Sequence, residues 1–336
     1  MMKKILFFDI NPSPMIEKGI MPAFEKLGYV AAMPANRLQF DNLKYPNCMT
    51  SHLTRQEKYD IVYKSIQETD ADTVFLNGAN LYYDAVSNAC KAFNKYFIYW
   101  ATEDPVLYNL MLPITARHAD LVLSPAIECV EEYRKMGLNA HLMMFGCNPD
   151  YHKTGSHNPK YDFDIVLQAS YYNHPARIKG YDIILQPAIR LYEEHYRVGV
   201  WGAFWNTPFG MKYMKHHELY HGFHPNEDIS DICASTKIIL GIQCSDCSVT
   251  QQSMRSFEVL SCGGFHLTQH VKSMDYWFEN GKHLVSVKDK EEAYEKMKYY
   301  LKHDEERKKI ALQGYEYVRN NHTYIHRIRE AVLPNL

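Results

Sequence analysis

One helix-forming stretch carries a cation, an amide and a carboxylate on the same side. Residues 251–262 read Q-Q-S-M-R-S-F-E-V-L-S-C, and a helix over this range places Gln251, Arg255 and Glu258 on one face and apolar side chains on another. The free N–H groups of a helix's first turn favour an anion such as phosphate, whereas a carboxylate suits sugar hydroxyls. We therefore predict a nucleotide site, with phosphates near the helix start and a ribose near Glu258.

The residues around this stretch predict the elements that hold it in place. Gly263 and Gly264 supply a helix stop, because glycine adopts positive φ at little cost. The following F-H-L-T, residues 265–268, is typical of a short buried strand. Loop, helix and strand are thus predicted in immediate succession.

The N-terminal half alternates apolar runs with helical patterns. Strands are expected at 3–10, 29–34, 73–77, 96–100, 119–124 and 140–145, with helices at about 15–27, 53–68, 81–94 and 126–136. Continuous apolar strands separated by helices indicate a parallel sheet that is covered on both faces.

The same alternation begins again after a polar stretch at 147–160. Strands are expected at about 162–170, 197–202 and 237–242, and helices at about 180–195 and 229–235. We predict an α/β protein of two Rossmann-like, doubly wound domains, residues 1–152 and 153–336, facing each other across a cleft. Such a cleft suits the meeting of two substrates.

Composition excludes several other classes. A formal net charge of −2 gives no global attraction to nucleic acid or to an anionic membrane. The apolar run near the N-terminus is too short for a signal peptide or a membrane span, so a cytoplasmic protein is expected. Eight scattered cysteines, with a single C-x-x-C at Cys244 and Cys247, predict reduced thiols and no metal site. Neither G-x-G-x-x-G nor a Walker A motif is present.

Four motifs resemble a known enzyme family. They are W-A-T-E-D-P at 100–105, D-L-V-L-S with F-G-C-N-P at 145–149, H-P-A-R-I-K-G-Y-D-I-I-L at 174–185, and R-S-F-E-V-L-S-C-G-G at 255–264 with a later H-T-Y at 322–324 and Arg327. Together they resemble the GT-B glycosyltransferases, specifically the group typified by the spore-maturation protein CgeB, over nearly the whole chain.

The resemblance implies transfer of a sugar from a nucleotide sugar, most often a UDP-sugar, to an acceptor held by the N-terminal domain. Departure of the nucleotide leaves negative charge on a diphosphate, which cations stabilise without a metal cofactor. Arg177 and Lys179 are the expected cations, with Arg255 reaching the same group. Glu258 matches the glutamate that accepts hydrogen bonds from the ribose. An ion pair between Arg255 and Glu258 is its structural alternative.

Several other positions are expected to line the donor site. Thr250 stands where many retaining relatives carry a second glutamate, and it can instead cap the helix. The remaining expected contacts are Gly222, Phe223 and His224 for the nucleobase, Ser170 and Tyr171 for the diphosphate or sugar, and Asn11 and Ser13 in the first N-terminal loop for acceptor or donor.

Two carboxylates are candidates for acceptor chemistry. Glu103 and Asp104 follow directly after a predicted strand, where a carboxylate can take the acceptor proton as general base. Asp104 precedes Pro105 and can equally cap a helix.

The sequence does not identify the acceptor, which is a glycan, a small molecule, a protein or a modified DNA base. The last corresponds to a phage-type DNA glycosyltransferase, which needs a basic groove, yet residues 1–150 hold about 14 Lys and Arg against 17 Asp and Glu. An alternative from another class is a non-catalytic nucleotide or sugar binder.

Overall fold

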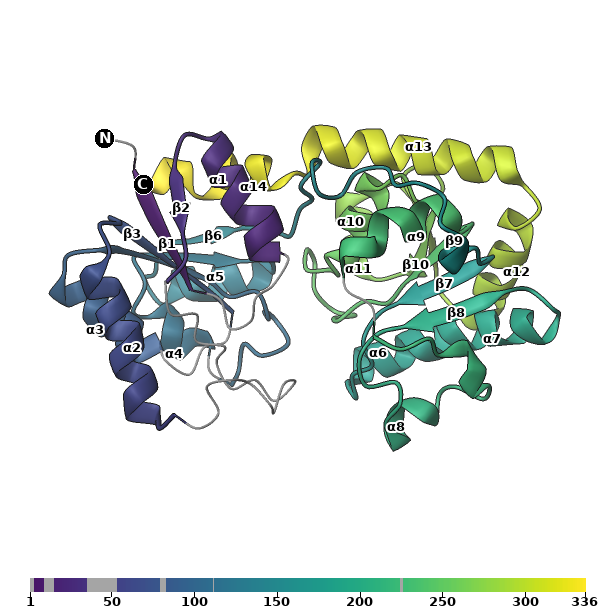
Figure 1. Ribbon diagram of the computed structural model, residues 1–336, viewed down its shortest axis with the longest axis horizontal. Coiled ribbons are helices and arrows are strands. Elements are labelled where there is room, and N and C mark those ends of the chain that lie inside the picture. The colour runs from purple at the N-terminus through teal and green to yellow at the C-terminus, as the bar shows by residue number, and fades with distance from the viewer. Residues whose placement is uncertain (1–2, 9–14, 35–52, 79–82, 111, 224–225) are drawn as a thin grey trace. The chain divides into compact units, whose positions relative to one another are not determined.

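The computed structural model describes residues 3–8, 15–34, 53–78, 83–110, 112–223 and 226–336. The chain divides into two compact units, shown in Figure 1. Unit 1 comprises Met1–Met144 and Tyr324–Leu336, and unit 2 comprises Phe145–Thr323.

Unit 1 is built on a six-stranded parallel sheet. Its strands are β1 (Lys4–Phe8), β2 (Val30–Ala32), β3 (Thr73–Asn77), β4 (Tyr96–Trp100), β5 (Leu121–Ser124) and β6 (Ala140–Leu142). The spatial order is β2-β1-β3-β4-β5-β6, so the strand order reverses between β1 and β3. The central strands β3 and β4 are buried almost throughout, because helices cover both faces of the sheet.

Helices cover both faces of this sheet. They are a π-helical turn (Met15–Ile20) continuing into α1 (Met21–Lys26), then α2 (Arg55–Glu68), α3 (Tyr83–Ala92), α4 (Leu112–Ala116), α5 (Ile127–Lys135) and the C-terminal α14 (Tyr324–Ala331). One core cluster joins α2, α3 and α5 to alternate side chains of β1, β3, β4 and β5. On the other face Phe24 of α1 packs on Phe7 and Phe75.

Unit 2 repeats the architecture with five parallel strands. They are β7 (Ile165–Gln168), β8 (Val198–Trp201), β9 (Ile238–Gly241), β10 (His266–Gln269) and β11 (Val285–Val287), in the order β11-β10-β9-β7-β8. The strand order therefore reverses between β7 and β9. In sheets of this type, ligands collect beyond the carboxyl ends of the strands at such a reversal.

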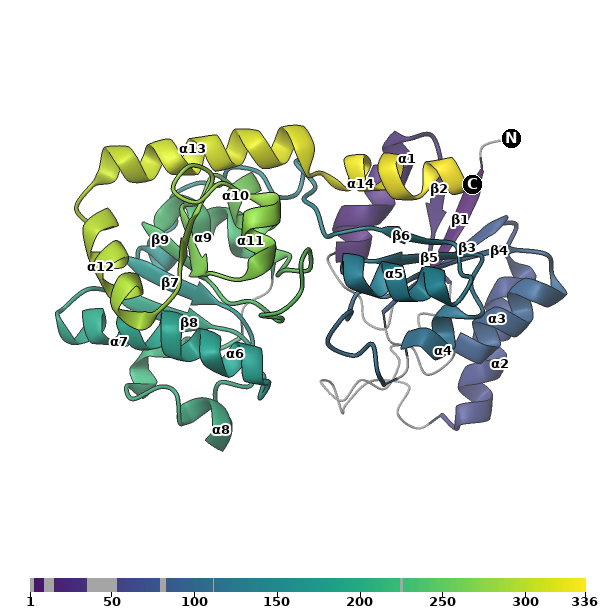
Figure 2. The same ribbon diagram turned by 180° about the vertical axis from the view of Figure 1, so that it is seen from behind.

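The helices of unit 2 form two layers, which Figures 1 and 2 show from opposite sides. They are α6 (Pro175–Gly180) with a π-helical segment (Tyr181–Leu185), α7 (Gln186–Glu193), α8 (Pro208–Met211), α9 (Ile229–Ser235), α10 (Arg255–Ser261), α11 (Lys272–Trp277), α12 (Lys290–Tyr300) and α13 (Asp304–Asn321). Helices α7 and α12 pack on one face of the sheet, and α9 and α10 pack on the other.

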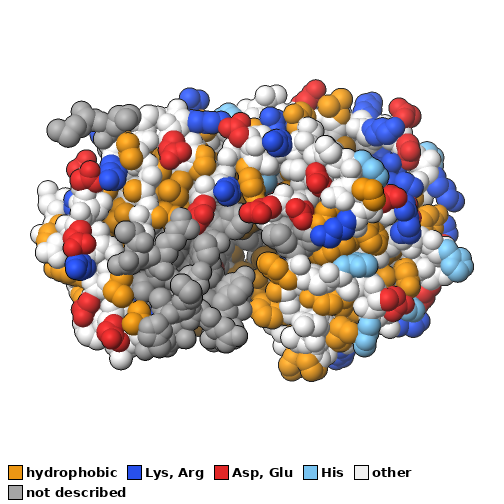
Figure 3. Space-filling model, in the orientation of Figure 1, with side chains coloured by type: hydrophobic (Ala, Val, Ile, Leu, Met, Phe, Trp, Pro, Cys, Tyr) orange, Lys and Arg blue, Asp and Glu red, His pale blue; other side chains and the backbone are white. Residues whose placement is uncertain are grey.

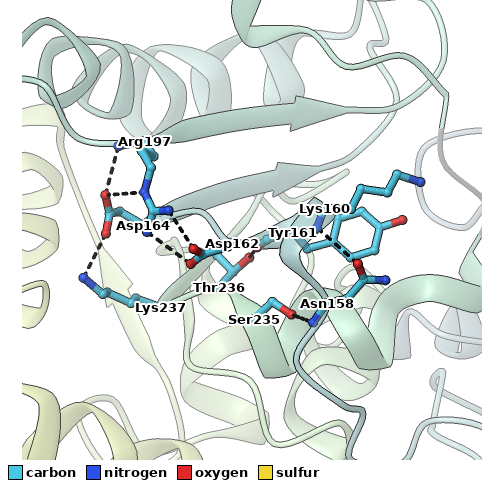
Figure 4. A network of polar contacts seen from close by, with 9 residues as sticks. All are labelled: Asn158, Lys160, Tyr161, Asp162, Asp164, Arg197, Ser235, Thr236 and Lys237. Atoms are coloured by element: carbon cyan, nitrogen blue, oxygen red, sulfur yellow. Dashed lines mark hydrogen bonds and ion pairs between the residues drawn. The ribbon is translucent and has the colours of Figure 1, made fainter.

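A charged network joins the amino ends of three neighbouring strands in unit 2 (Figure 4). Asp164, just before β7, accepts hydrogen bonds from the Arg197 backbone N–H and the Lys237 ammonium, both at 2.9 Å. Arg197 also donates to Asp162 at 2.8 and 3.1 Å, in a two-pronged contact. Because Arg197 precedes β8 and Lys237 precedes β9, the network links β7, β8 and β9 at their amino ends, opposite the carboxyl ends of the strands.

The division into units differs from the predicted boundary of 152/153. The chain passes from unit 1 to unit 2 after Met144 and returns to unit 1 at Tyr324, so the last helix, α14, belongs to unit 1. Helix α14 packs on α1 and the helical turn before it, and an added Cβ at Gly19 would lie 2.6 Å from the Tyr324 ring. Only glycine admits the ring of α14 this near to the first helical segment.

Candidate functional site

The candidate site of unit 2 lies at the reversal between β7 and β9. Three segments meet there: residues 169–180 after β7, residues 242–254 after β9, and α10. Direct contacts join the first two segments, because Arg177 reaches Cys244 and Lys179 reaches Asp246.

Helix α10 is shorter than the sequence predicts. It begins at Arg255 rather than Gln251, so the expected helical placement of Gln251 is wrong. Ser248 Oγ accepts a hydrogen bond from the Gln251 N–H at 3.0 Å, and Gln243 Oε1 accepts one from the Ser253 N–H at 2.7 Å. These side chains hold the backbone in a non-helical course before the helix starts.

Thr250 is not the cap of this helix. It is fully buried, and its carbonyl accepts a hydrogen bond from Trp277 Nε1 at 2.6 Å, while Met254 occupies the N-cap position. The predicted stop is confirmed, since Gly263 has φ of +78°. Glu258 consequently lies in the first turn of α10.

Glu258 is the centre of a buried polar cluster. Its side chain is 2% exposed, and Arg255 Nη1 lies 3.0 Å from Oε2. Asn226 Nδ2 donates to Oε1 at 3.2 Å, and His152 Nε2 lies 3.5 Å from the same oxygen. Arg255 also donates to Asn226 Oδ1, so the cation, the amide and the carboxylate form a closed ring of contacts.

The partners of Glu258 keep it ionised. Burial raises the pKa of a carboxyl group, but the charge of Arg255 and the adjacent His152 outweigh burial and lower the pKa of Glu258 to about 2. His152 Nδ1 accepts the Asn148 N–H at 3.1 Å, so Nε2, which faces Glu258, is the ring nitrogen that carries a hydrogen. Asn226 and His152 were not predicted from the sequence.

Arg177 is an internal cation of this site. Arg177 is 6% exposed, and its Nη2 donates a hydrogen bond to the Ser170 carbonyl at 2.6 Å. Nη1 lies 3.7 Å from Cys244 Sγ, and Nε lies 3.5 Å from the Tyr181 hydroxyl. The guanidinium thereby ties the loop after β7 to the loop after β9.

Lys179 is the exposed counterpart of Arg177. Its side chain is 60% exposed, and its ammonium lies 3.6 Å from Asp246 Oδ2. An exposed pair of this kind contributes little to stability, so the ammonium exchanges partners at low cost.

Ser170 and Tyr171 have mainly structural contacts. Ser170 Oγ accepts the Ala203 N–H at 3.3 Å. Tyr171 is buried, with its ring centroid 5.4 Å from those of Tyr181 and Trp205. The structure therefore places Tyr171 in the aromatic core of unit 2.

The segment expected at the nucleobase runs close to Glu258. Gly222 has φ of +93°, and its carbonyl accepts the Gly202 N–H at 3.0 Å. Phe223 is 62% exposed, an unusual position for a large aromatic ring. His224 lies outside the described residues, and Asn226 follows shortly after it with its contact to Glu258.

Gln252, beside the predicted Gln251, is a further polar feature that sequence reasoning missed. It is fully buried, and neither of its amide atoms has a hydrogen-bond partner. Gln251 Oε1 is also buried without a partner. Such groups are rare in folded proteins and are usually satisfied by water or a ligand.

The two carboxylates of unit 1 have different environments. Asp104 is fully buried, and its oxygens accept hydrogen bonds from Ser124 Oγ at 2.7 Å and the Tyr133 hydroxyl at 3.4 Å. Burial raises the pKa of Asp104 to about 7 despite these hydrogen bonds. Residues 102–110 form turns, so Asp104 does not cap an α-helix. Glu103 is half-buried and accepts a hydrogen bond from Thr102 Oγ1 at 3.1 Å.

Some expectations concern other parts of the chain. Asn11 and Ser13 lie outside the described residues. Among the residues that the structure describes, no group of three or more His, Cys, Asp or Glu side chains is arranged to hold a metal ion. None of the described helices is both long and apolar enough to cross a membrane.

Comparisons with known proteins agree with this architecture. A family model described as "Glycosyl transferase-like" matches residues 179–332. No curated protein sequence matches the chain.

Solved structures match nearly the whole chain. Anabaena HepE in complex with UDP-glucose is 13% identical, with 99% of this chain and 100% of that chain covered and a TM-score of 0.68. Sucrose-phosphate synthase from Thermosynechococcus elongatus is 11% identical, with 98% and 97% covered and a TM-score of 0.66. A putative UDP-N-acetylglucosamine 2-epimerase from Listeria monocytogenes is 14% identical, with 98% and 95% covered and a TM-score of 0.56. The predicted fold is confirmed: the chain has the GT-B fold, with two Rossmann-like units.

Proposed function

We propose that the protein is a glycosyltransferase that moves a sugar from a nucleotide sugar, a UDP-sugar in the first instance, to an acceptor. The "Glycosyl transferase-like" match covers residues 179–332, which include α10 and Glu258. Among the structural neighbours, HepE was solved with UDP-glucose. The observation that carries the proposal is the buried, ionised Glu258 beside the reversal of strand order in unit 2.

In this proposal Glu258 accepts hydrogen bonds from the ribose hydroxyls. Each hydrogen bond to an ionised acceptor is roughly twice as strong as a neutral one. Asn226 occupies Oε1 in the present structure, so ribose binding replaces that contact. Phe223 is exposed and lies three residues before the short helical turn Asn226–Asp228, and it supplies a face for the base.

The diphosphate is assigned to Lys179 and Arg177, with Arg255 at the start of α10. When the sugar leaves, the diphosphate gains negative charge, and fixed cations lower the energy of that state. Lys179 needs only to exchange Asp246 for a phosphate oxygen. No metal ion is required by this scheme.

Glu103 is the proposed general base for the acceptor. Asp104 is enclosed by Ser124 and Tyr133, which leaves Glu103 as the carboxylate with access to solvent. On the face seen in Figure 3, the described surface of unit 1 carries acidic and basic side chains side by side rather than a continuous basic band. The excess of acidic over basic residues in 1–150, about 17 against 14, favours a small or neutral acceptor over DNA.

Two measurements test the proposal. Thermal shifts with UDP-, GDP- and dTDP-sugars identify the nucleobase that the protein binds. We expect the UDP-sugars to stabilise the wild type, and we expect Glu258→Ala to lose this stabilisation. Release of UDP from the stabilising sugar, followed in the presence of candidate acceptors, separates an enzyme from a non-catalytic binder. No stabilisation by any nucleotide refutes the donor site. Stabilisation without release under any acceptor favours the binder.

A further inference from the structure

Two cysteines in the loop after β9 differ from the other described cysteines. Cys247 is exposed and Cys244 is half-buried, whereas Cys90, Cys129, Cys147, Cys233 and Cys262 are buried. Reactive thiols are those that solvent can reach. The accessible thiols of the described chain thus occur together, separated by two residues.

The backbone of this loop is bent at several positions. The chain bends at Cys244, Asp246 and Cys247. Ser245 Oγ lies 3.6 Å from Cys247 Sγ and accepts the Ser248 N–H at 3.2 Å. These contacts hold Cys247 against Ser245, the residue that follows Cys244.

A cation lies against one of the two sulfurs. Arg177 Nη1 is 3.7 Å from Cys244 Sγ, and the guanidinium is held there by the Ser170 carbonyl at 2.6 Å. Thiols that oxidants can reach and that lie beside a positively charged group are candidates for oxidation. Cys244 has this environment, and Cys247 is the nearby second thiol.

We propose that Cys244 and Cys247 are a reversible oxidation site, and that a disulfide between them weakens nucleotide binding. The Cys244 sulfur attacks a peroxide oxygen as its thiol proton leaves, the O–O bond breaks, and the departing hydroxide takes up that proton, so that a sulfenic acid and one water form. Cys247 then attacks the Cys244 sulfur, the S–O bond breaks, and a second water leaves as the S–S bond forms. The two thiols lose two electrons in total, and the peroxide gains them.

The consequence for binding rests on the function proposed above. Asp246, between the two cysteines, is the partner of Lys179, and Cys244 contacts Arg177. Closing a disulfide changes the course of the loop and removes the Cys244 contact that helps to hold the Arg177 guanidinium, one of the cations assigned to the diphosphate. Misplacing one charged hydrogen bond weakens binding by about tenfold.

The modification is measured independently of binding. Trypsin cleaves after Lys237 and Arg255, so the peptide 238–255 contains Cys244 and Cys247 and no other cysteine. The Cys48→Ser background removes the one cysteine outside the described residues. After treatment with hydrogen peroxide, this peptide is expected to lose about 2 Da, and to regain it with dithiothreitol.

Single variants assign the roles of the two thiols. Cys247→Ser is expected to trap a sulfenic acid at residue 244, detectable with dimedone, whereas Cys244→Ser is expected to give neither product. The proposed site is overturned if peroxide leaves the peptide 238–255 reduced and the buried cysteines are also still reduced.

Titration of UDP into reduced and oxidised protein tests the effect on binding. We expect about tenfold weaker binding after oxidation, no such change in Cys247→Ser, and full recovery with dithiothreitol. Equal or tighter binding by the oxidised protein overturns the regulatory role. If the reduced protein binds no nucleotide, the proposed function fails while the mass measurement still decides the modification.

Discussion

Replacing Glu258 by Gln should reveal how strongly unit 2 depends on one buried charge. The pKa of Glu258 is lowered from 4.5 to about 2. A shift of this size makes the ionised carboxylate worth about 3 kcal/mol of folding stability near pH 7. Because the folded pKa is the lower one, that stability is present above the ordinary pKa and is lost as the pH falls toward about 2.

The variant should lack this pH dependence. Glu258→Gln leaves the Arg255 guanidinium without its counter-charge, so it should be less stable than wild type by about 2–4 kcal/mol near pH 7. At about pH 3.5 the wild type has lost about 1.5 kcal/mol of the contribution, and the difference between the proteins should shrink by that amount.

Urea unfolding between neutral and acidic pH measures the difference. Tryptophan fluorescence reports mainly on unit 2, which holds Trp201, Trp205 and Trp277, whereas unit 1 holds Trp100. Glu316→Gln, an exposed change in α13, is the matched control and should follow the wild type at each pH. A constant gap between wild type and Glu258→Gln across the pH range would refute the reasoning.

Three further changes test other parts of the structure. Wild-type stability should fall as the pH rises from about 5 to about 8, because the raised pKa of Asp104 favours the folded state only while that group is protonated. Asp104→Asn should flatten this dependence in urea unfolding, and an unchanged slope would contradict the burial argument. Gly19→Ala should destabilise unit 1 by about 1–3 kcal/mol through its clash with Tyr324, and a melting temperature equal to wild type would show that the ring moves freely. Asp164→Asn should cost about 1–3 kcal/mol near pH 7, since the hydrogen bond from Lys237 holds the pKa of Asp164 low against burial. That cost should diminish below about pH 4 as the wild-type carboxylate is protonated, and a cost that persists there would contradict the assigned role.

Much of the fold could be predicted because its signals are local. The strands Thr73–Asn77 and Tyr96–Trp100 have the predicted bounds, since each is a continuous apolar run between polar breaks. The helix Ile229–Ser235 was also predicted at its observed bounds. Strand β11 and helix α11 were missed, as both are short and their patterns are weak.

The site could be predicted only in part, because its contacts are not local. Glu258 was recognised from its own helix, but Asn226 and His152 come from segments with no pattern that points to α10. The start of α10 depends on a hydrogen bond from Ser253 to Gln243, ten residues earlier. The burial of Asp104 depends on Ser124 and Tyr133, which no spacing rule connects to it.

The most direct test of the central claim is calorimetric titration of UDP into wild type, Glu258→Gln and Glu316→Gln. The account predicts saturable binding by wild type and Glu316→Gln. It predicts at least about tenfold weaker binding by Glu258→Gln, through loss of the charged acceptor for the ribose. Equal affinity of all three proteins for UDP, or none in any of them, would contradict the assignment of Glu258 to a nucleotide site.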